Sequence, residues 1–172
     1  MDNCCCGFGH RNSQFNFIDE LQIIIKQLIL TDNINVFLTG GMGEFDSQFA
    51  TAVRLCKIYN KDVKLILVKP YFSNELNVNK EYYEYYYDDI FIPEELAGSH
   101  YKAAITKRNR WMIDQSQIIL SGVYRDFGGA YETIKYAQKT DKRVITIKNS
   151  CSHYSKLSKW LCNLCSNMFI IL

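Results

Sequence analysis

Neither a long apolar run nor a marked excess of one charge occurs in this sequence of 172 residues. Every apolar run is shorter than the roughly 20 residues that a membrane-spanning helix needs. The 20 basic and 18 acidic residues leave a formal net charge of +2, too little for a strong electrostatic field toward nucleic acid or an anionic membrane. The start of the chain also lacks the basic and apolar segments of a signal peptide, so we expect a cytoplasmic protein with no membrane partner.

Disulfide-forming patterns are also missing, although the chain has seven cysteines. An odd count with three consecutive cysteines at positions 4–6 suits a secreted scaffold poorly and favours free thiols in a reducing compartment. Cys162 and Cys165 form a CxxC motif, with Cys151 and His153 close by. Tetrahedral zinc takes such ligands, but the second ligand pair does not have the spacing of a known zinc finger. We therefore predict no metal site and no cofactor.

The chain has no internal repeat and no low-complexity linker. Its length and its 48% hydrophobic content fit one globular domain with a substantial core. We predict that residues 1–150 form this domain and that residues 151–172 form an extension. The extension ends in the apolar run MFIIL at 168–172, so we expect it to pack on the domain or on a second subunit, and we expect a homo-oligomer.

Short apolar runs and helical periodicities alternate along the chain. Segments with strand character occur at residues 4–8, 34–39, 64–68, 88–93, 118–121 and 143–148. The run at 64–68 is nearly continuous in apolar residues, which is typical of a strand covered on both faces. Segments with helical spacing lie between them, at residues 17–30, from Asp46 onward, and at 75–89, 97–116 and 131–139. This alternation predicts an α/β fold: a Rossmann-like open sheet, mostly parallel, with helices on both faces and right-handed crossovers.

The glycines are concentrated at the ends of three predicted strands. Eight of the nine glycines lie in or just after these strands: Gly7, Gly9, Gly40, Gly41, Gly43, Gly122, Gly128 and Gly129. Gly98 is the exception. In an open α/β sheet, ligands bind outside the carboxyl ends of the strands. Glycines there let backbone N–H groups approach a ligand closely, so we predict a ligand crevice at this edge.

The segment that follows Lys107 and Arg108 strengthens this interpretation. It contains a basic helix, a buried strand, the pair Gly128–Gly129 and the start of a new helix. A helix N-terminus offers unpaired N–H groups and the positive end of the helix dipole, and an arginine fork matches phosphate oxygens. A phosphate site is the functional interpretation. A plain turn at the glycines and a solvated basic helix are the structural alternatives.

Four motifs follow one another along the chain: CCCGFGHR at 4–11, GGMGEFD at 40–46, KRNRWMID at 107–114 and GGAYET at 128–133. Together they resemble the SLOG superfamily of Rossmann-like proteins, which includes the LOG phosphoribohydrolases and the DNA-processing protein A. The resemblance is to a short bacterial branch with a cysteine-rich first strand and a GHR motif, and it covers about residues 4 to 147. It implies binding of a nucleotide or of a nucleotide-derived molecule such as an ADP-ribose-type signal.

Some members of this superfamily hydrolyse an N-glycosidic bond, and the sequence departs from the motif that the resemblance links to that reaction. The LOG motif reads PGGxGTxxE, whereas this chain has Phe127 for the proline and Lys135 for the glutamate. Glu132 lies three residues earlier, and Arg108 matches the family's helix arginine. The departure weakens the case for hydrolysis and leaves the case for binding intact.

Each of the four motifs contributes candidate ligand-binding residues. They are Gly9, His10, Arg11, Gly40, Gly41, Met42, Gly43, Asp46, Lys107, Arg108, Asn109, Gly128, Gly129, Ala130 and Tyr131. The arginines and the lysine would hold phosphate, Asp46 would accept ribose hydroxyls, and Tyr131 would stack on a base. The structural alternative for Asp46 is a helix cap. The tyrosines between positions 82 and 87 are interpreted as packing or interface residues.

Two functions are compatible with these residues. The first is a binding protein that senses or sequesters a nucleotide derivative of ADP-ribose or cyclic-nucleotide type, with bacterial or phage defence signalling as the hypothetical setting. The alternative is an N-glycosidase acting on a nucleoside monophosphate, with Glu132, Asp46 or Glu44 as the carboxylate and Arg108 as a further catalytic candidate. Nucleic acid is not an expected partner, because phosphate neutralisation needs a basic surface.

Overall fold

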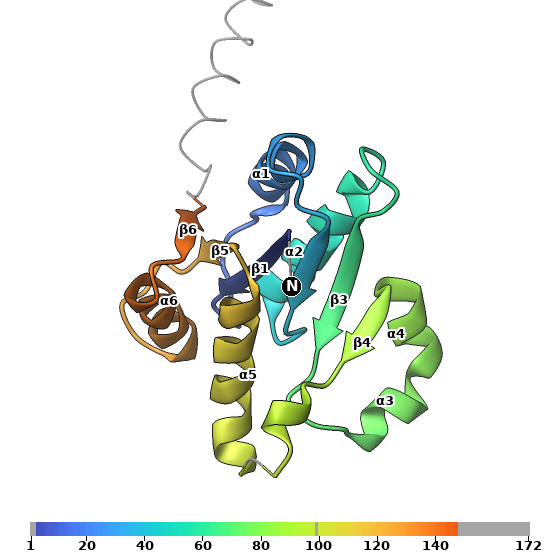
Figure 1. Cartoon of the computed structure of the whole chain (residues 1–172), viewed down its shortest axis with the longest axis vertical. Coiled ribbons are helices and arrows are strands. Elements are labelled where there is room, and N and C mark those ends of the chain that lie inside the picture. Colours follow the sequence, from blue (N-terminus) through green and yellow to red (C-terminus); the bar gives the residue numbers. More distant parts are fainter. Residues whose placement is uncertain (1–2, 99, 148–172) are drawn as a thin grey trace, which may run out of the picture.

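Six parallel strands form one open sheet (Figure 1). The computed structural model describes residues 3–98 and 100–147. Across the sheet the strand order is β4-β3-β2-β1-β5-β6, and every neighbouring pair is parallel. The strands are β1 (Cys4–Gly9), β2 (Val36–Thr39), β3 (Lys64–Val68), β4 (Asp89–Phe91), β5 (Ile118–Gly122) and β6 (Arg143–Thr146). The predicted fold class is therefore confirmed.

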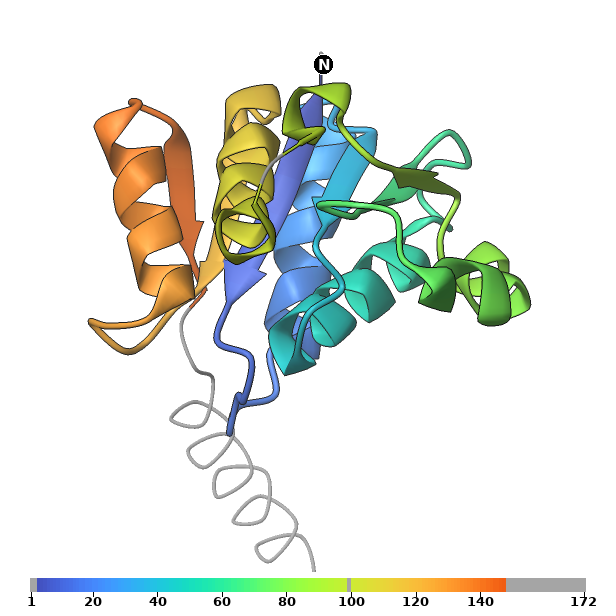
Figure 2. The ribbon, with the colours of Figure 1, turned by 90° about the horizontal axis from the view of Figure 1, so that it is seen from below.

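Helices cover both faces of the sheet. Helices α1 and α2 pack on one face and α5 and α6 on the other, while α3 and α4 lie beside the β4 edge (Figures 1 and 2). The helices are α1 (Ile18–Thr31), α2 (Glu44–Cys56), α3 (Asn74–Val78), α4 (Lys80–Tyr86), α5 (Tyr101–Gln115) and α6 (Gly129–Lys139), with a 3-10 turn η1 (Glu94–Leu96). The strand order reverses between β1 and β5, and ligands bind at such a switch point in open α/β sheets.

The central strand β1 explains why three consecutive cysteines occur at its start. Successive side chains of a strand point to opposite faces of the sheet. Cys5 packs in the core under α1 and α2, whereas Cys4 and Cys6 pack in the core under α5 and α6. All three are buried free thiols, and burial raises the pKa of each. The prediction of free thiols at these positions is confirmed.

Two predicted helices differ from the structure. Residues 75–89 form two short helices rather than one, because Asn79 leaves the helical conformation between α3 and α4 (φ −108°, ψ 30°). Asparagine favours such breaks because its side chain competes for backbone hydrogen bonds. The helix predicted over residues 97–116 begins only at Tyr101, after η1 and after Gly98, whose φ is 75°.

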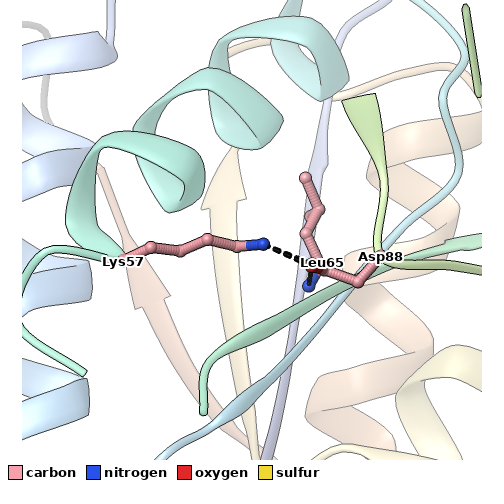
Figure 3. A network of polar contacts seen from close by, with 3 residues as sticks. All are labelled: Lys57, Leu65 and Asp88. Atoms are coloured by element: carbon pink, nitrogen blue, oxygen red, sulfur yellow. Dashed lines mark hydrogen bonds and ion pairs between the residues drawn. The ribbon is translucent and has the colours of Figure 1, made fainter. Parts of the chain in front are cut away.

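Asp88 holds the edge strand β4 to the rest of the sheet (Figure 3). Its carboxylate accepts a hydrogen bond from the backbone N–H of Leu65 (2.7 Å) and pairs with Lys57, directly after α2 (Nζ–Oδ1 2.6 Å). Its own N–H donates to the carbonyl of Leu65 (2.9 Å). One residue thus joins α2, β3 and β4 next to the tyrosine-rich helix α4.

Several predictions concern residues 148–172, which lie outside the described residues. They include the extension at 151–172, the CxxC motif with Cys151 and His153, and the apolar end that suggested an oligomer. Among the helices of residues 3–98 and 100–147, none combines the length and the apolar character needed to cross a bilayer.

Candidate functional site

A crevice of about 450 Å³ lies at the carboxyl ends of β1 and β2, next to the loop that follows β5. Its size falls within the range of about 300–1,000 Å³ that is usual for small-molecule sites. Four segments line it: the end of β1, the loop into α2, part of α5 and the loop into α6. The lining residues are Phe8, Gly9, His10, Arg11, Asn12, Gly40, Met42, Asp46, Ile105, Arg108, Asn109, Arg125, Phe127, Gly128, Gly129 and Ala130.

The loop between β2 and α2 presents a buried carboxylate to the crevice. Gly43 is the residue that caps α2, with a φ of 121° that favours glycine. Asp46 lies in the first turn, where its Oδ2 accepts a hydrogen bond from the N–H of Met42 (2.7 Å), so the helix-cap interpretation of Asp46 is wrong. Burial raises the pKa of Asp46, while the hydrogen bond from Met42 and the charges of Arg108 and Arg11 oppose that shift.

Arg108 reaches the crevice from α5 as a buried residue, not from a solvated helix face. Its Nη1 donates to the carbonyl of Val68 at the end of β3 (2.9 Å), and its Nη2 lies 3.3 Å from Sδ of Met42. The Nε atom is buried and has no hydrogen-bond partner within the described residues. Burial lowers the pKa of Arg108, and the charge of Asp46 counteracts the shift. The guanidinium therefore keeps one unsatisfied buried donor.

His10 holds the loop between β5 and α6. Its Nε2 accepts hydrogen bonds from the N–H groups of Tyr124 (3.2 Å) and Arg125 (3.0 Å). An accepting ring nitrogen carries no proton, so these contacts assign the neutral Nδ1–H tautomer. Burial lowers the pKa of His10, and the charge of Arg125 acts in the same direction. His10 lines the crevice, but its hydrogen bonds anchor the loop.

The N-terminus of α6 forms another wall of the crevice. Gly128 precedes the helix with a φ of 93°, and Gly129 and Ala130 open its first turn. The first N–H groups of a helix have no acceptor within the helix. Asn109 of α5 donates to Oγ1 of Thr133 (3.1 Å), which donates in turn to the carbonyl of Gly129 (2.7 Å). These hydrogen bonds tie the start of α6 to α5.

The charges around the crevice favour an anion. Arg11, Arg108 and Arg125 line it, and within the described residues Asp46 is its one lining carboxylate. The dipole of α6 adds partial positive charge at the same wall. The crevice is therefore locally positive, although the net charge of the whole chain is close to zero.

Four of the predicted ligand-binding residues do not line this crevice. Gly41 and Gly43 border pockets outside the crevice. Lys107 is exposed on α5, and the ring of Tyr131 lies 5.3 Å from Nζ of Lys135. The other predicted residues all line the crevice.

Two of the three carboxylates considered for glycosidic cleavage also lie outside the crevice. Glu132 is exposed on α6, where it pairs with Lys135 (3.4 Å). Glu44 is exposed and accepts a hydrogen bond from the N–H of Ser13 (2.7 Å). Asp46 is the candidate that remains.

Sequence reasoning missed five of the lining residues, namely Phe8, Asn12, Ile105, Arg125 and Phe127. Arg125 matters most, because it adds a cation to the crevice. It lies three residues before Gly128, so a basic residue in the glycine loop was an available signal. Phe127 is 64% exposed and adds an aromatic face.

Sequence comparison identifies a relative without defining a family. No protein-family model matches the chain. The uncharacterized SPbeta prophage-derived protein YoqJ of Bacillus subtilis is 27% identical, over 71% of this chain and 80% of its own.

Solved structures place the fold more firmly. DNA processing protein A of Streptococcus pneumoniae matches with a TM-score of 0.62 at 16% identity, over 92% of this chain and 56% of that chain. The same protein of Helicobacter pylori, described as binding single-stranded DNA, matches with a TM-score of 0.58 at 17% identity, over 93% of this chain and 72% of that chain. A molybdenum cofactor binding protein of Rippkaea orientalis matches with a TM-score of 0.55 at 17% identity, over 95% of this chain and 84% of that chain. The chain has the Rossmann-like fold of these proteins and spans little more than half of the first.

Proposed function

We propose that this protein binds a nucleotide-derived small molecule in the crevice, with an anionic group of the ligand between the start of α6 and the arginines. One observation carries the proposal: Arg11, Arg108, Arg125 and the N-terminus of α6 surround one space of about 450 Å³. Backbone N–H groups and arginine forks are the usual partners of phosphate oxygens. The exposed ring of Phe127 provides an apolar surface for a base.

ADP-ribose and cyclic nucleotides are the ligand classes that we favour, and sensing or sequestration is the role. Both roles require tight binding and release of an unchanged molecule. Defence signalling between bacteria and phages is the setting of this proposal, and similarity to a prophage-derived protein supports the link to phages. Assembly into a homo-oligomer remains part of this proposal, and sedimentation of the full chain tests it.

A depletion experiment separates binding from turnover. The full chain is incubated with AMP, cyclic AMP and ADP-ribose, removed by filtration and heated, and both fractions are analysed by mass spectrometry. A binding protein depletes a ligand from solution and returns it unchanged on heating. Failure to deplete any of these nucleotides contradicts the proposal.

Arg125 offers a matched test of the site itself. Arg125→Ala should weaken binding about tenfold, equivalent to about 1.4 kcal/mol for one lost charge-assisted contact. Lys139→Ala removes an exposed cation at the opposite end of α6 and should leave the affinity unchanged. Equal affinities for Arg125→Ala and wild type would place the ligand elsewhere.

One observation favours an N-glycosidase as the second candidate. Asp46 is a buried carboxylate in the crevice, and an ionised carboxylate beside a sugar stabilises an oxocarbenium-like transition state. Such an enzyme would return free base and sugar phosphate in the depletion experiment. Asp46→Asn would then abolish the products without preventing depletion.

Single-stranded DNA is a further candidate, because one structural neighbour is described as binding it. A local cluster of arginines can serve this role even when the net charge is small. The test is a mobility shift of a single-stranded oligonucleotide. A shift that weakens between about 50 and about 200 mM salt, and that is lost in Arg125→Ala, would support this function. Absence of any shift would remove it.

A further inference from the structure

A second pocket adjoins the β2–α2 loop, beside the crevice. It has a volume of about 430 Å³ and lies between the end of β3 and the helices α3 and α4. Gly41 forms part of its wall, whereas the neighbouring Gly40 and Met42 line the crevice. We call it the aromatic pocket, because three tyrosines from α4 and its end line it: Tyr82, Tyr83 and Tyr87.

Lys69 places a half-buried ammonium in the aromatic pocket. Its Nζ lies 5.2 Å from the centroid of the Tyr83 ring and makes no hydrogen bond or ion pair within residues 3–98 and 100–147. The pocket's carboxylate, Glu75, accepts a hydrogen bond from Oη of Tyr83 (2.7 Å). Burial lowers the pKa of Lys69; Glu75 opposes this shift, and the charge of Arg108 adds to it. An anion beside Lys69 would pair with an ammonium that forms no salt bridge within the described residues.

The walls of this pocket suit a planar ring. Tyr83 is only 6% exposed and is fixed by its hydrogen bond to Glu75, whereas Tyr82 is 53% exposed and lines the pocket with its ring centroid 5.4 Å from that of Tyr83. Gly41 has a φ of 62°, and a Cβ there would come within 2.6 Å of Leu67 and 3.7 Å of Oη of Tyr87. The glycine therefore lets the loop lie directly against Leu67, with Tyr87 at contact distance.

We propose that the aromatic pocket is a second ligand site, for an anionic molecule with a planar heteroaromatic ring such as a nucleoside monophosphate. The ring packs against Tyr82 and Tyr87, and the anion lies at Nζ of Lys69. Stacking on aromatic side chains tolerates different bases, because every base has a π-face. The site does not depend on the crevice, since the two sets of lining residues differ.

Amide resonances of the full chain test this proposal directly. Titration with AMP or GMP should shift the amides of Gly41, Lys69 and Tyr82 saturably. Lys69→Met and Tyr82→Ala should each weaken this binding about tenfold, the effect of losing one charged or stacking contact. Because Tyr82 is largely exposed, Tyr82→Ala keeps the fold, and its dispersed spectrum verifies that.

Matched variants at the amino ends of the strands serve as controls. Lys61→Met, in the turn before β3, and Tyr59→Ala, just after α2, remove the same groups and should bind as wild type. The amides of Gly129 and Ala130 report on the crevice in the same spectra, so failure of one site is distinguished from failure of the other. Shifts confined to those two amides, no shift with either nucleotide, or unchanged affinity in Lys69→Met would overturn the proposal.

Discussion

Gly40, directly after β2, lies against the guanidinium of Arg108. A methyl group at position 40 would overlap with Nη1, the atom that donates to the carbonyl of Val68. The missing side chain therefore allows a buried arginine to cross from α5 to the end of β3.

Gly40→Ala should force Arg108 out of this position. We expect the free energy of unfolding to fall by about 1–3 kcal/mol, the range for overpacking and for a buried group left unpaired. Urea denaturation followed by circular dichroism measures the change. Gly129→Ala is the control, because a Cβ there meets no atom within 4 Å, so its stability should not fall. An equal loss in both variants would argue against a specific role for the Gly40–Arg108 contact.

Asp46→Asn should remove the destabilisation that arises when the buried carboxyl group of Asp46 ionises. Since the pKa of Asp46 is raised, the folded state binds its proton more tightly than the unfolded state does. The resulting stabilisation is complete below about pH 4 and is lost as the pH rises through the folded pKa. Asparagine keeps an oxygen for the N–H of Met42 and cannot ionise. The stability of the variant relative to wild type should therefore be higher at pH 7 than at pH 3.

Urea denaturation at both pH values measures this difference, because contributions from other carboxylates cancel between variant and wild type. Asp126→Asn, at an exposed position in the β5–α6 loop, controls for the loss of one charge. A relative stability of Asp46→Asn that falls toward neutral pH would show that the carboxylate is net favourable when ionised.

Acidification should release the β5–α6 loop through His10. Its pKa is lowered in the folded state, so the unfolded state binds the proton more tightly. The contribution of His10 to the stability of the folded state is complete above about pH 6.5, and it is lost as the pH falls through the pKa of His10 in the folded state. A proton on Nε2 would break the hydrogen bonds from Tyr124 and Arg125. The amides of both residues should shift, and their protection from exchange relative to the intrinsic rate should fall, as the pH is lowered from about 7 to about 5.

His10→Gln should lack this pH dependence, whereas His100→Gln should retain it. Amide spectra of both variants across the same pH range make the comparison. Persistence of the effect in His10→Gln would assign it to another group.

Asp88→Ala should loosen the β4 edge more than Lys57→Met does. The first change leaves the N–H of Leu65 without its side-chain acceptor, at a cost of about 1–3 kcal/mol. The second removes a partly exposed ion pair, for which about 0.2–1 kcal/mol is usual. Thermal denaturation ranks the two variants. The reverse order would mean that the ion pair, not the backbone contact, holds the edge.

The strands and the crevice could be predicted because they depend on local runs and on a topological rule. The apolar run at Lys64–Val68 coincides with β3, and the glycines after β1 and β2 meet at the carboxyl edge because parallel strands end there together. The break at Asn79 between α3 and α4 was not predicted, because one asparagine within a helical pattern does not determine where a helix ends.

The burial of Arg108 was harder to foresee, because the basic residues Lys107 and Arg110 lie close to it in α5 and are exposed. Ala104, Arg108 and Met112 are spaced four residues apart, and all three are buried. This spacing places Arg108 on the inner stripe of the helix and turns the adjacent Lys107 outward. The direction of Tyr131 and Glu132 likewise depends on the rotation of α6, which motif order does not determine.

The reactivity of the three buried thiols of β1 should report whether a ligand is bound to the protein. They lie between β2 and β5 in the centre of the sheet, so an alkylating reagent reaches them only when the sheet opens. A ligand that binds the closed sheet reduces the open population by the factor 1 + [L]/Kd. Slower alkylation of residues 4–6, read by peptide mapping, would therefore identify a ligand from a metabolite mixture before its chemistry is known.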